Sequence, residues 1–301
     1  MLKITTMKHY LVILLCCYSM RIFAQTAADS TDRPNFTTEE VKFNSGEITL
    51  EGTIFKPKEI YGALVLVHGS GQEKRMVNMA TLLAKNGIAV LTYDKRGAGK
   101  SGGVYVGPEV GTNNIDSANL DLLALDASNA VKELLAHLPA KHGALGLMGF
   151  SQAGWVIPIA ATKNSKVGFM VLFSGPVIST LEQLRFQFYT NGNTKFWDTH
   201  TDAEAREHIR TDADRYQFAA TDPKKSLVKL SIPGLWLFGG KDIQIPANLC
   251  IENLNVLQAK GKPFTYQLFP ELGHNTASVK SPEPINAAIS WIKTFKSSGK
   301  R

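Results

Sequence analysis

The spacing of hydrophobic residues changes at about residue 63 of the chain. Before this point, residues 41–44 and 48–55 alternate apolar and polar side chains around Ser45-Gly46. Such alternation is typical of an antiparallel hairpin with one face in solvent. Residues 63–67 are instead apolar throughout, as expected of a parallel strand that is buried on both faces. The chain is therefore predicted to begin with a hairpin and to continue into a sheet of a different kind.

From there, apolar runs alternate with amphipathic segments to the end of the chain. Strands are predicted over residues 63–67, 88–93, 144–150, 168–173, 234–238 and 264–269. Helices are predicted over about 76–86, 117–138, 152–161, 247–260 and 284–295. Strands and helices that alternate in this way are joined by right-handed crossovers onto one mainly parallel sheet. The predicted fold class is α/β, with helices on both faces of the sheet.

One long segment, about residues 177–229, interrupts the alternation and holds no convincing strand pattern. It is compatible with helices and carries a group of aromatic residues: Phe186, Phe188, Tyr189, Phe196, Trp197, Tyr216 and Phe218. An insertion after a sheet strand can cover the carboxyl ends of the strands, where open α/β sheets bind ligands. We therefore expect a helical lid in which Phe186, Phe188 and Trp197 line the substrate pocket. The alternative is that these aromatic residues only pack the insertion onto the body.

The first residues have the pattern of a secretory signal peptide, predicted over residues 1–24. Lys3 and Lys8 precede an apolar run at 11–17, and Ala24 is a small residue at a suitable cleavage point. The run is too short for an ordinary membrane span, although an uncleaved anchor is the alternative. The sequence thus predicts export to the periplasm or out of the cell, with no stable membrane insertion after cleavage.

After the signal peptide, the chain divides into a linker and one domain. Residues 25–40 are largely polar and are predicted as a linker. The 301-residue chain is 44% hydrophobic and 20% charged, an ordinary globular composition that allows a large core. Residues 41–297 are therefore predicted to form one α/β domain that contains the helical insertion.

The charge balance does not indicate a nucleic-acid partner. The chain has 33 Lys and Arg against 26 Asp and Glu, a net charge of +7. Loss of residues 1–24 removes Lys3, Lys8 and Arg21 and no acid, which leaves 30 basic residues against 26 acidic ones and a net charge of +4. The basic residues are scattered, as on a solvated exterior.

No cofactor or metal is indicated either. The presumed signal peptide holds the other two cysteines, so Cys250 is alone in the mature chain and no His or Cys pair has the spacing of metal ligands. Residues 97–101 imitate the end of a phosphate-binding loop, but Asp94 stands where that motif requires a glycine. Asp94 and Arg96 are instead expected to brace this loop through charged hydrogen bonds.

The first candidate for chemistry is Ser151, on the turn between a predicted strand and a predicted helix. A nucleophile elbow needs small residues two positions before and after its serine, because strand and helix approach closely there. Gly149 and Ala153 meet this need. The alternative is an ordinary buried serine at a strand-to-helix junction.

A serine hydroxyl is a poor nucleophile at neutral pH unless a histidine base and an orienting acid activate it. His274 follows the strand that ends at Phe269, and Asp242 follows the preceding strand, so both belong to the same sheet edge as Ser151. Their chain order is Ser, Asp, His. Ser151, Asp242 and His274 are therefore the predicted triad, with Glu271 as the nearby alternative for the acid.

Acyl attack also requires donors that stabilise the oxyanion. One predicted donor is the backbone N–H of Gln152, directly after the nucleophile. The other is expected from the loop that follows residue 67, His68-Gly69-Ser70-Gly71, where the N–H of Ser70 is favoured and that of Gly71 is the alternative.

Taken together, these segments resemble the landmarks of the α/β-hydrolase superfamily, in its order. The matching segments are 68–71 (HGSG), 93–101 (YDKRGAGKS), 149–154 (GFSQAG), 240–242 (GKD) and 273–274 (GH). The resemblance covers about residues 41–297 and is greatest to secreted or periplasmic bacterial carboxylesterases of the serine-hydrolase type. It is more distant to dienelactone hydrolases, which have a cysteine where this chain has Ser151, and to the catalytic domains of prolyl oligopeptidases, which a propeller domain precedes.

The resemblance implies an α/β-hydrolase fold and a serine hydrolase that cleaves a small-molecule carboxylic ester through an acyl-enzyme. A thioesterase, an amidase or a peptidase would use the same machinery, and only the pocket would distinguish them. A different class of protein, a non-catalytic exported binding protein on a hydrolase scaffold, is the remaining alternative.

Overall fold

The computed structural model describes residues 35–107, 114–213, 218–277 and 281–295. Among the described residues, those from Phe36 onward belong to one compact unit. The predicted signal peptide and most of the predicted linker lie outside the described residues. Within them, no helix is both long and apolar enough to span a membrane.

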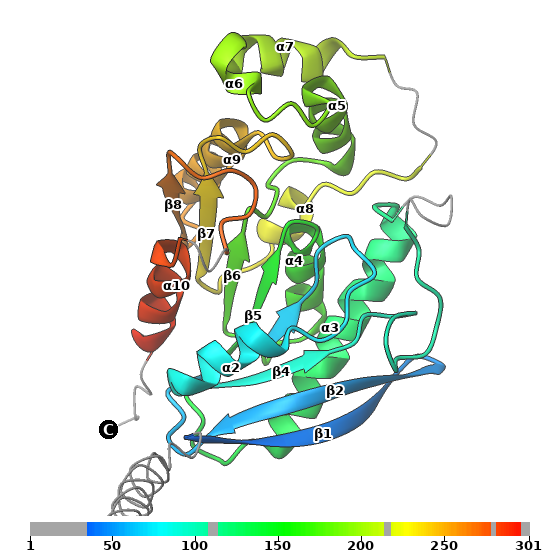
Figure 1. Cartoon of the computed structure of the whole chain (residues 1–301), viewed down its shortest axis with the longest axis vertical. Helices are drawn as coiled ribbons and strands as arrows, with labels where there is room; N and C mark the ends of the chain where they lie inside the picture. The colour runs from blue at the N-terminus through cyan, green and yellow to red at the C-terminus, as the bar shows by residue number, and fades with distance from the viewer. Residues whose placement is uncertain (1–34, 108–113, 214–217, 278–280, 296–301) are drawn as a thin grey trace, which may run out of the picture. The chain divides into compact units, whose positions relative to one another are not determined.

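The described strands form one eight-stranded sheet in the order β1-β2-β4-β3-β5-β6-β7-β8 (Figure 1). Its strands are β1 (Phe36–Ser45), β2 (Ile48–Pro57), β3 (Gly62–Val67), β4 (Ile88–Tyr93), β5 (Ala144–Phe150), β6 (Phe169–Phe173), β7 (Gly234–Gly239) and β8 (Phe264–Phe269). β1 pairs with β2, and β2 with β4, in antiparallel register, whereas every later pair is parallel. The predicted hairpin and mainly parallel sheet are thus confirmed.

β1 starts earlier than the sequence predicts, since the predicted linker extends to residue 40. In the structure these residues pair in register with β2, Phe36 opposite Pro57 and Glu40 opposite Thr53. Residues 37–40 are exposed, and burial alternates only from Val41 onward. The strand therefore extends beyond the part of β1 that shows a hydrophobic pattern.

Strand β3 shows why the central strands are apolar throughout. All six residues are buried, and successive side chains enter different cores. Val65 and Val67 pack in the core on one face of the sheet, and Leu64 and Leu66 in the core on the other. Successive side chains of a strand point to opposite faces of the sheet. In a strand that is covered on both faces, every position is therefore buried and apolar.

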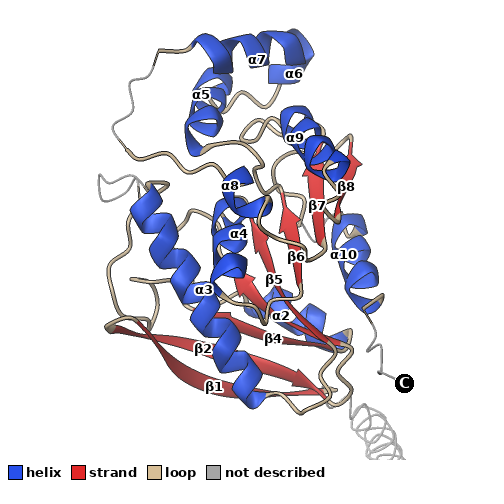
Figure 2. Ribbon diagram, turned by 180° about the vertical axis from the view of Figure 1, so that it is seen from behind, coloured by secondary structure: helices blue, strands red, loops and turns tan. Residues whose placement is uncertain are grey.

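Helices cover both faces of the sheet (Figure 2). Three of them, α3 (Ser117–His137), α4 (Ala153–Lys163) and α9 (Ala247–Ala259), contribute to the larger core. On the opposite face, α2 (Val77–Lys85) and α10 (Glu283–Lys293) contribute to the second core. This arrangement is the predicted one.

The helical insertion lies beyond the carboxyl ends of the central strands (Figure 1). Its helices are α5 (Thr180–Thr190), α6 (Phe196–Thr199), α7 (Asp202–Thr211) and the short α8 (Lys224–Leu227). Both α5 and α7 begin with a capping box, at Ser179 and Thr201 respectively. Phe186, Phe196 and residues of α7 form a small core of their own inside the insertion.

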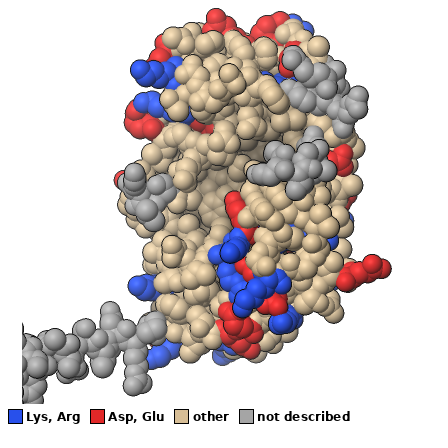
Figure 3. Space-filling model, turned by 45° about the vertical axis from the view of Figure 1, so that its right-hand side comes forward, with Lys and Arg blue, Asp and Glu red and all other residues tan. Residues whose placement is uncertain are grey.

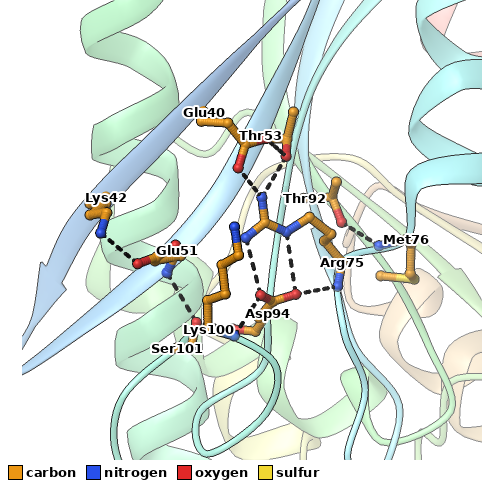
Figure 4. Close-up of polar contacts among 10 residues, drawn as sticks. All are labelled: Glu40, Lys42, Glu51, Thr53, Arg75, Met76, Thr92, Asp94, Lys100 and Ser101. Carbon is orange, nitrogen blue, oxygen red and sulfur yellow. Dashed lines mark hydrogen bonds and ion pairs between the residues drawn. The ribbon is translucent and has the colours of Figure 1, made fainter.

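The loop after β4 is held by charged hydrogen bonds, as expected for Asp94 and Arg96. Asp94 accepts hydrogen bonds from the backbone and guanidinium of Arg75 and from the backbone N–H of Lys100. Arg75 in turn reaches Glu40 on β1 (Figure 4). Arg96 makes two hydrogen bonds, of 3.0 and 2.7 Å, to the carboxylate of Asp126 on α3. The loop is thereby fixed to both the hairpin and a helix.

Replacement of Asp94 by asparagine should lower the free energy of unfolding at pH 7 by about 2 kcal/mol, since it removes charged hydrogen bonds from a buried site. Burial alone would raise the pKa of Asp94, but the hydrogen bonds from Arg75 and Lys100 outweigh it and hold the pKa below its ordinary value. The carboxylate therefore stabilises the fold fully above its ordinary pKa of 3.8 and loses this effect as the pH falls through the lower folded-state pKa.

The difference in stability between wild type and Asp94→Asn should thus be constant at neutral pH and shrink only below about pH 4. Denaturant unfolding followed between pH 7 and pH 3 measures it. The exposed Asp121, which pairs with Lys163, provides the matched control Asp121→Asn with little effect. An Asp94→Asn protein as stable as wild type at pH 7 would contradict the role given to this carboxylate.

Candidate active site

Ser151 lies on a strained turn between the end of β5 at Phe150 and the start of α4 at Ala153. Its φ of 49° is in the left-handed region, which residues other than glycine rarely adopt. The turn is tight because strand and helix touch: a Cβ at Gly149 would lie 2.4 Å from the Cβ of Ala153. The backbone N–H of Ser151 donates to the carbonyl of Phe173 at the end of the neighbouring strand, at 2.9 Å.

His274 and Asp242 are in contact. The distance between His274 Nδ1 and Asp242 Oδ2 is 2.8 Å. The other oxygen, Oδ1, accepts the backbone N–H groups of Gln244 and Ile245 at 2.7 and 2.9 Å. Because a carboxylate can only accept, Nδ1 carries the proton of a neutral His274 and Nε2 keeps its lone pair. The Asp242 side chain is fully buried, whereas that of His274 is 18% exposed, so the imidazole can meet a ligand.

The alternative acid and an alternative base are both engaged elsewhere. Glu271 is 80% exposed and forms an ion pair with Lys241 at 2.5 Å. His68 is buried beside Tyr93, and burial, together with the charge of Lys95, lowers the pKa of His68 to about 3. His68 therefore stays neutral and inaccessible at ordinary pH.

The end of β6 connects Ser151 to the loop that carries His274. Ser174 follows Phe173 directly, is buried, and donates its hydroxyl to the carbonyl of His274 at 2.7 Å. Like Ser151 it has a left-handed backbone, with φ 46°. Among the hydrogen bonds of the described residues, none joins Ser151 Oγ to His274 Nε2. Such catalytic hydrogen bonds are often long without a substrate.

Sequence reasoning missed Ser174, although a signal was present. The serine follows Phe173 directly at the end of a predicted strand, as Ser151 follows Phe150 at the elbow. A strained backbone is a common mark of a functional site. We therefore count Ser174 among the residues that hold the site.

The predicted oxyanion loop, residues 68–71, is held in place by the buried side chain of Lys95. Lys95 is 3% exposed, and its Nζ donates to the carbonyls of Gly69 at 2.6 Å and Gly71 at 3.1 Å. It also donates to Oε1 of Gln152, at 3.1 Å. One ammonium group thus joins the two segments from which the oxyanion donors were predicted. Sequence reasoning missed Lys95 as well, since a lysine after a buried strand is usually solvated.

The carbonyls of this loop fix the direction of its N–H groups. A trans peptide points its C=O and N–H to opposite sides. The C=O of Gly69 points to Lys95, and that of Ser70 accepts hydrogen bonds from Tyr105 at 2.8 Å and Asn114 at 3.0 Å. The N–H groups of Ser70 and Gly71 therefore point away from these partners. Neither makes a hydrogen bond to another described residue, so both remain candidates.

Gln152 is also fixed by its side chain. It is 1% exposed, donates to the carbonyl of Asn114 at 2.8 Å and accepts from Lys95. Its backbone N–H, at the start of α4, makes no hydrogen bond within the described part of the chain. The start of a helix favours negative charge in a ligand, because its first N–H groups have no partner within the helix.

The three aromatic residues expected to line the pocket have different environments. Phe186 is fully buried and packs against Phe196 and Trp197 in the core of the insertion, so its assignment to the pocket wall is corrected to the packing role. Phe188 is 62% exposed. Trp197 is partly buried, and its indole N–H donates to the backbone carbonyl of Asp242 at 2.8 Å. Of the three, Trp197 contacts the candidate site directly.

The surface of the molecule is hollowed below the insertion, and the hollow is lined mostly by uncharged residues (Figure 3). Acidic and basic side chains gather at its lower rim. Among the described residues, no group of three or more His, Cys, Asp or Glu side chains is placed to hold a metal ion.

Comparison with known proteins agrees with this fold. Residues 58–200 match the family described as serine aminopeptidase, S33. No curated protein matches the chain.

Solved structures with the same fold include two esterases and a peptidase. The Pyrococcus furiosus esterase is 16% identical with a TM-score of 0.64, over 87% of this chain and 92% of its own. A Pyrobaculum calidifontis esterase is also 16% identical, with a TM-score of 0.57, over 86% of this chain and 85% of the esterase. The Pyrococcus horikoshii acylaminoacyl peptidase is 18% identical, with a TM-score of 0.63, over 89% of this chain but 43% of the peptidase. The sheet of this chain, its family match over residues 58–200 and these shared folds show that it has the α/β-hydrolase fold.

Proposed function

We propose that this protein is an exported serine hydrolase that cleaves carboxylic esters of small molecules, with Ser151, Asp242 and His274 as its triad. The observation that carries the proposal is the 2.8 Å contact between His274 and Asp242, at the same edge of the sheet as a serine with a strained backbone. Export is proposed from the pattern of residues 1–24 alone.

The reaction would proceed in two halves. His274 Nε2 takes the proton from the Ser151 hydroxyl as Oγ attacks the ester carbonyl, and the carbonyl oxygen becomes an oxyanion. The N–H groups of Gln152 and of Ser70 or Gly71 would hold this oxyanion. The C–O bond then breaks, His274 returns the proton to the leaving alcohol, and the acyl group stays on Ser151. Water, deprotonated by His274, releases the acid by the same steps.

A peptidase is the second candidate, because the matching family is described as serine aminopeptidase and one structural neighbour is an acylaminoacyl peptidase. The machinery would be the same, with an amine in place of the alcohol as leaving group. The preference for an ester rests on the two esterases, because the match to this chain covers 92% and 85% of their chains.

A substrate panel tests this preference. Purified protein would be assayed on p-nitrophenyl esters, an acyl thioester and an acyl p-nitroanilide that share one acyl group, with Ser151→Ala as the blank. We expect the ester to give the highest kcat/KM. A nitroanilide cleaved as fast as the ester would favour the peptidase, and a thioester cleaved faster than both would favour a thioesterase. Fluorophosphonate labelling that fails on wild type would favour a non-catalytic binding protein.

A further inference from the structure

The insertion donates three hydrogen bonds to the acid loop, residues 240–246, which carries Asp242. Trp197 Nε1 donates to the carbonyl of Asp242 at 2.8 Å, Thr190 Oγ1 to that of Ile243 at 2.6 Å, and Gln183 Nε2 to that of Gln244 at 3.1 Å. The three acceptors are consecutive along the chain. Gln183 and Thr190 lie two helical turns apart on α5, and so on the same face of that helix.

Two peptide groups of the acid loop are held at both ends by these contacts. In the peptide between Ile243 and Gln244, the oxygen accepts from Thr190 and the N–H donates to Asp242 Oδ1 at 2.7 Å. In the next peptide, the oxygen accepts from Gln183 and the N–H of Ile245 donates to the same Oδ1 at 2.9 Å. Because C=O and N–H are opposite ends of a rigid plane, a donor on one side fixes the direction of the other.

These bonds are shielded from water. Thr190 is 1% exposed and Gln183 is 7% exposed. The side chain of Ile243 packs against the core of the insertion beside Phe186 and Phe196. A buried carbonyl that loses its donor is costly, so the loop has one favoured path between the insertion and Asp242.

We propose that Thr190 and Gln183 are positioning residues for the acid of the triad. By holding the carbonyl ends of the two peptides, they direct both N–H groups to Oδ1 of Asp242 and leave Oδ2 to His274. The inference rests on the proposed function, since it takes Asp242 as the orienting acid. This side of the insertion is then a fixed part of the active site, and a lid motion would have to occur elsewhere in the insertion.

The test compares Thr190→Val, which keeps the shape and loses the hydroxyl, with Thr190→Ser, which keeps the hydroxyl. Thr190→Val should lower kcat for a p-nitrophenyl ester roughly tenfold with KM little changed, because a small displacement of a catalytic group costs rate and Thr190 is buried away from ligand. Thr190→Ser should retain most of the wild-type kcat. Thr211→Val is the matched control, since the exposed Thr211 bonds its own helix and not the acid loop, and it should behave as wild type.

A second measurement needs no turnover. The Nδ1 proton shared by His274 and Asp242 should give a downfield proton NMR resonance in wild type, shifted or broadened in Thr190→Val and in Gln183→Leu but unchanged in Thr190→Ser. Thermal unfolding of each variant shows whether the fold is kept. If wild type neither turns over esters nor reacts with a fluorophosphonate, the proposed function fails while the resonance still tests the positioning. An unchanged resonance in both Thr190→Val and Gln183→Leu, or equal loss of kcat in Thr190→Ser and Thr190→Val, would overturn the inference.

Discussion

Replacement of Ser151 by alanine should abolish ester hydrolysis and fluorophosphonate labelling, with a fall in kcat of roughly 10⁶-fold by analogy with other serine hydrolases that lose their nucleophile. The variant loses one oxygen and keeps a Cβ. The backbone at φ 49° and the contact of Gly149 with Ala153 are unaffected, so the free energy of unfolding should stay close to that of wild type. Labelling detected by mass spectrometry and initial rates on a p-nitrophenyl ester are the measurements.

The exposed Ser165, at the turn after α4, provides a control of the same chemical change, and Ser165→Ala should label and turn over as wild type. A Ser151→Ala protein that still reacts with the fluorophosphonate at another serine would show that the nucleophile has been misassigned.

Asp242→Asn should lower kcat by roughly 10⁴-fold, the loss found in triads whose acid is neutralised. The contacts of this carboxylate explain why. Oδ1 accepts two backbone N–H groups, so an asparagine must turn its oxygen toward Gln244 and Ile245 and its NH₂ toward His274. Nδ1 of His274 then becomes an acceptor, and the proton moves to Nε2, where the base needs a lone pair.

Glu271→Gln is the control for this prediction, because Glu271 is exposed and pairs with Lys241. It should keep nearly all of the wild-type rate. Initial rates at saturating ester measure both variants. If Glu271→Gln loses activity and Asp242→Asn keeps it, the third member of the triad is not Asp242.

Much of the fold could be predicted because the central strands are buried on both faces. A strand such as β3 leaves no polar position, so its limits follow directly from the sequence. β1 was predicted too short because residues 37–40 pair with β2 through backbone hydrogen bonds while their polar side chains face solvent. Backbone pairing is independent of side-chain polarity and leaves no hydrophobic pattern.

The candidate site could be predicted because its residues follow the ends of strands, and the ends of these strands can be located in the sequence. Ser151 and Asp242 follow the buried strands β5 and β7, and His274 follows the edge strand β8. The contact between His274 and Asp242 follows from neighbouring strands that end at one edge. Phe186 was misplaced because the rotation of a short helix about its axis depends on its tertiary contacts. Thr190 and Lys95 act through hydrogen bonds to backbone carbonyls, which occur at any residue and so give no signal in the sequence.

Ser151 and Ser174, which follow β5 and β6, both have a left-handed backbone conformation. At both positions the needs of stability and of activity are opposed. A non-glycine residue held in such a conformation costs on the order of 1–3 kcal/mol, and glycine adopts it without steric conflict. Laboratory evolution for heat resistance alone would therefore favour glycine at both positions. At 151 that exchange removes the proposed nucleophile, and at 174 it releases the carbonyl of His274. Stabilising substitutions in this protein should therefore keep both serines unchanged and be sought far from the carboxyl edge of the sheet.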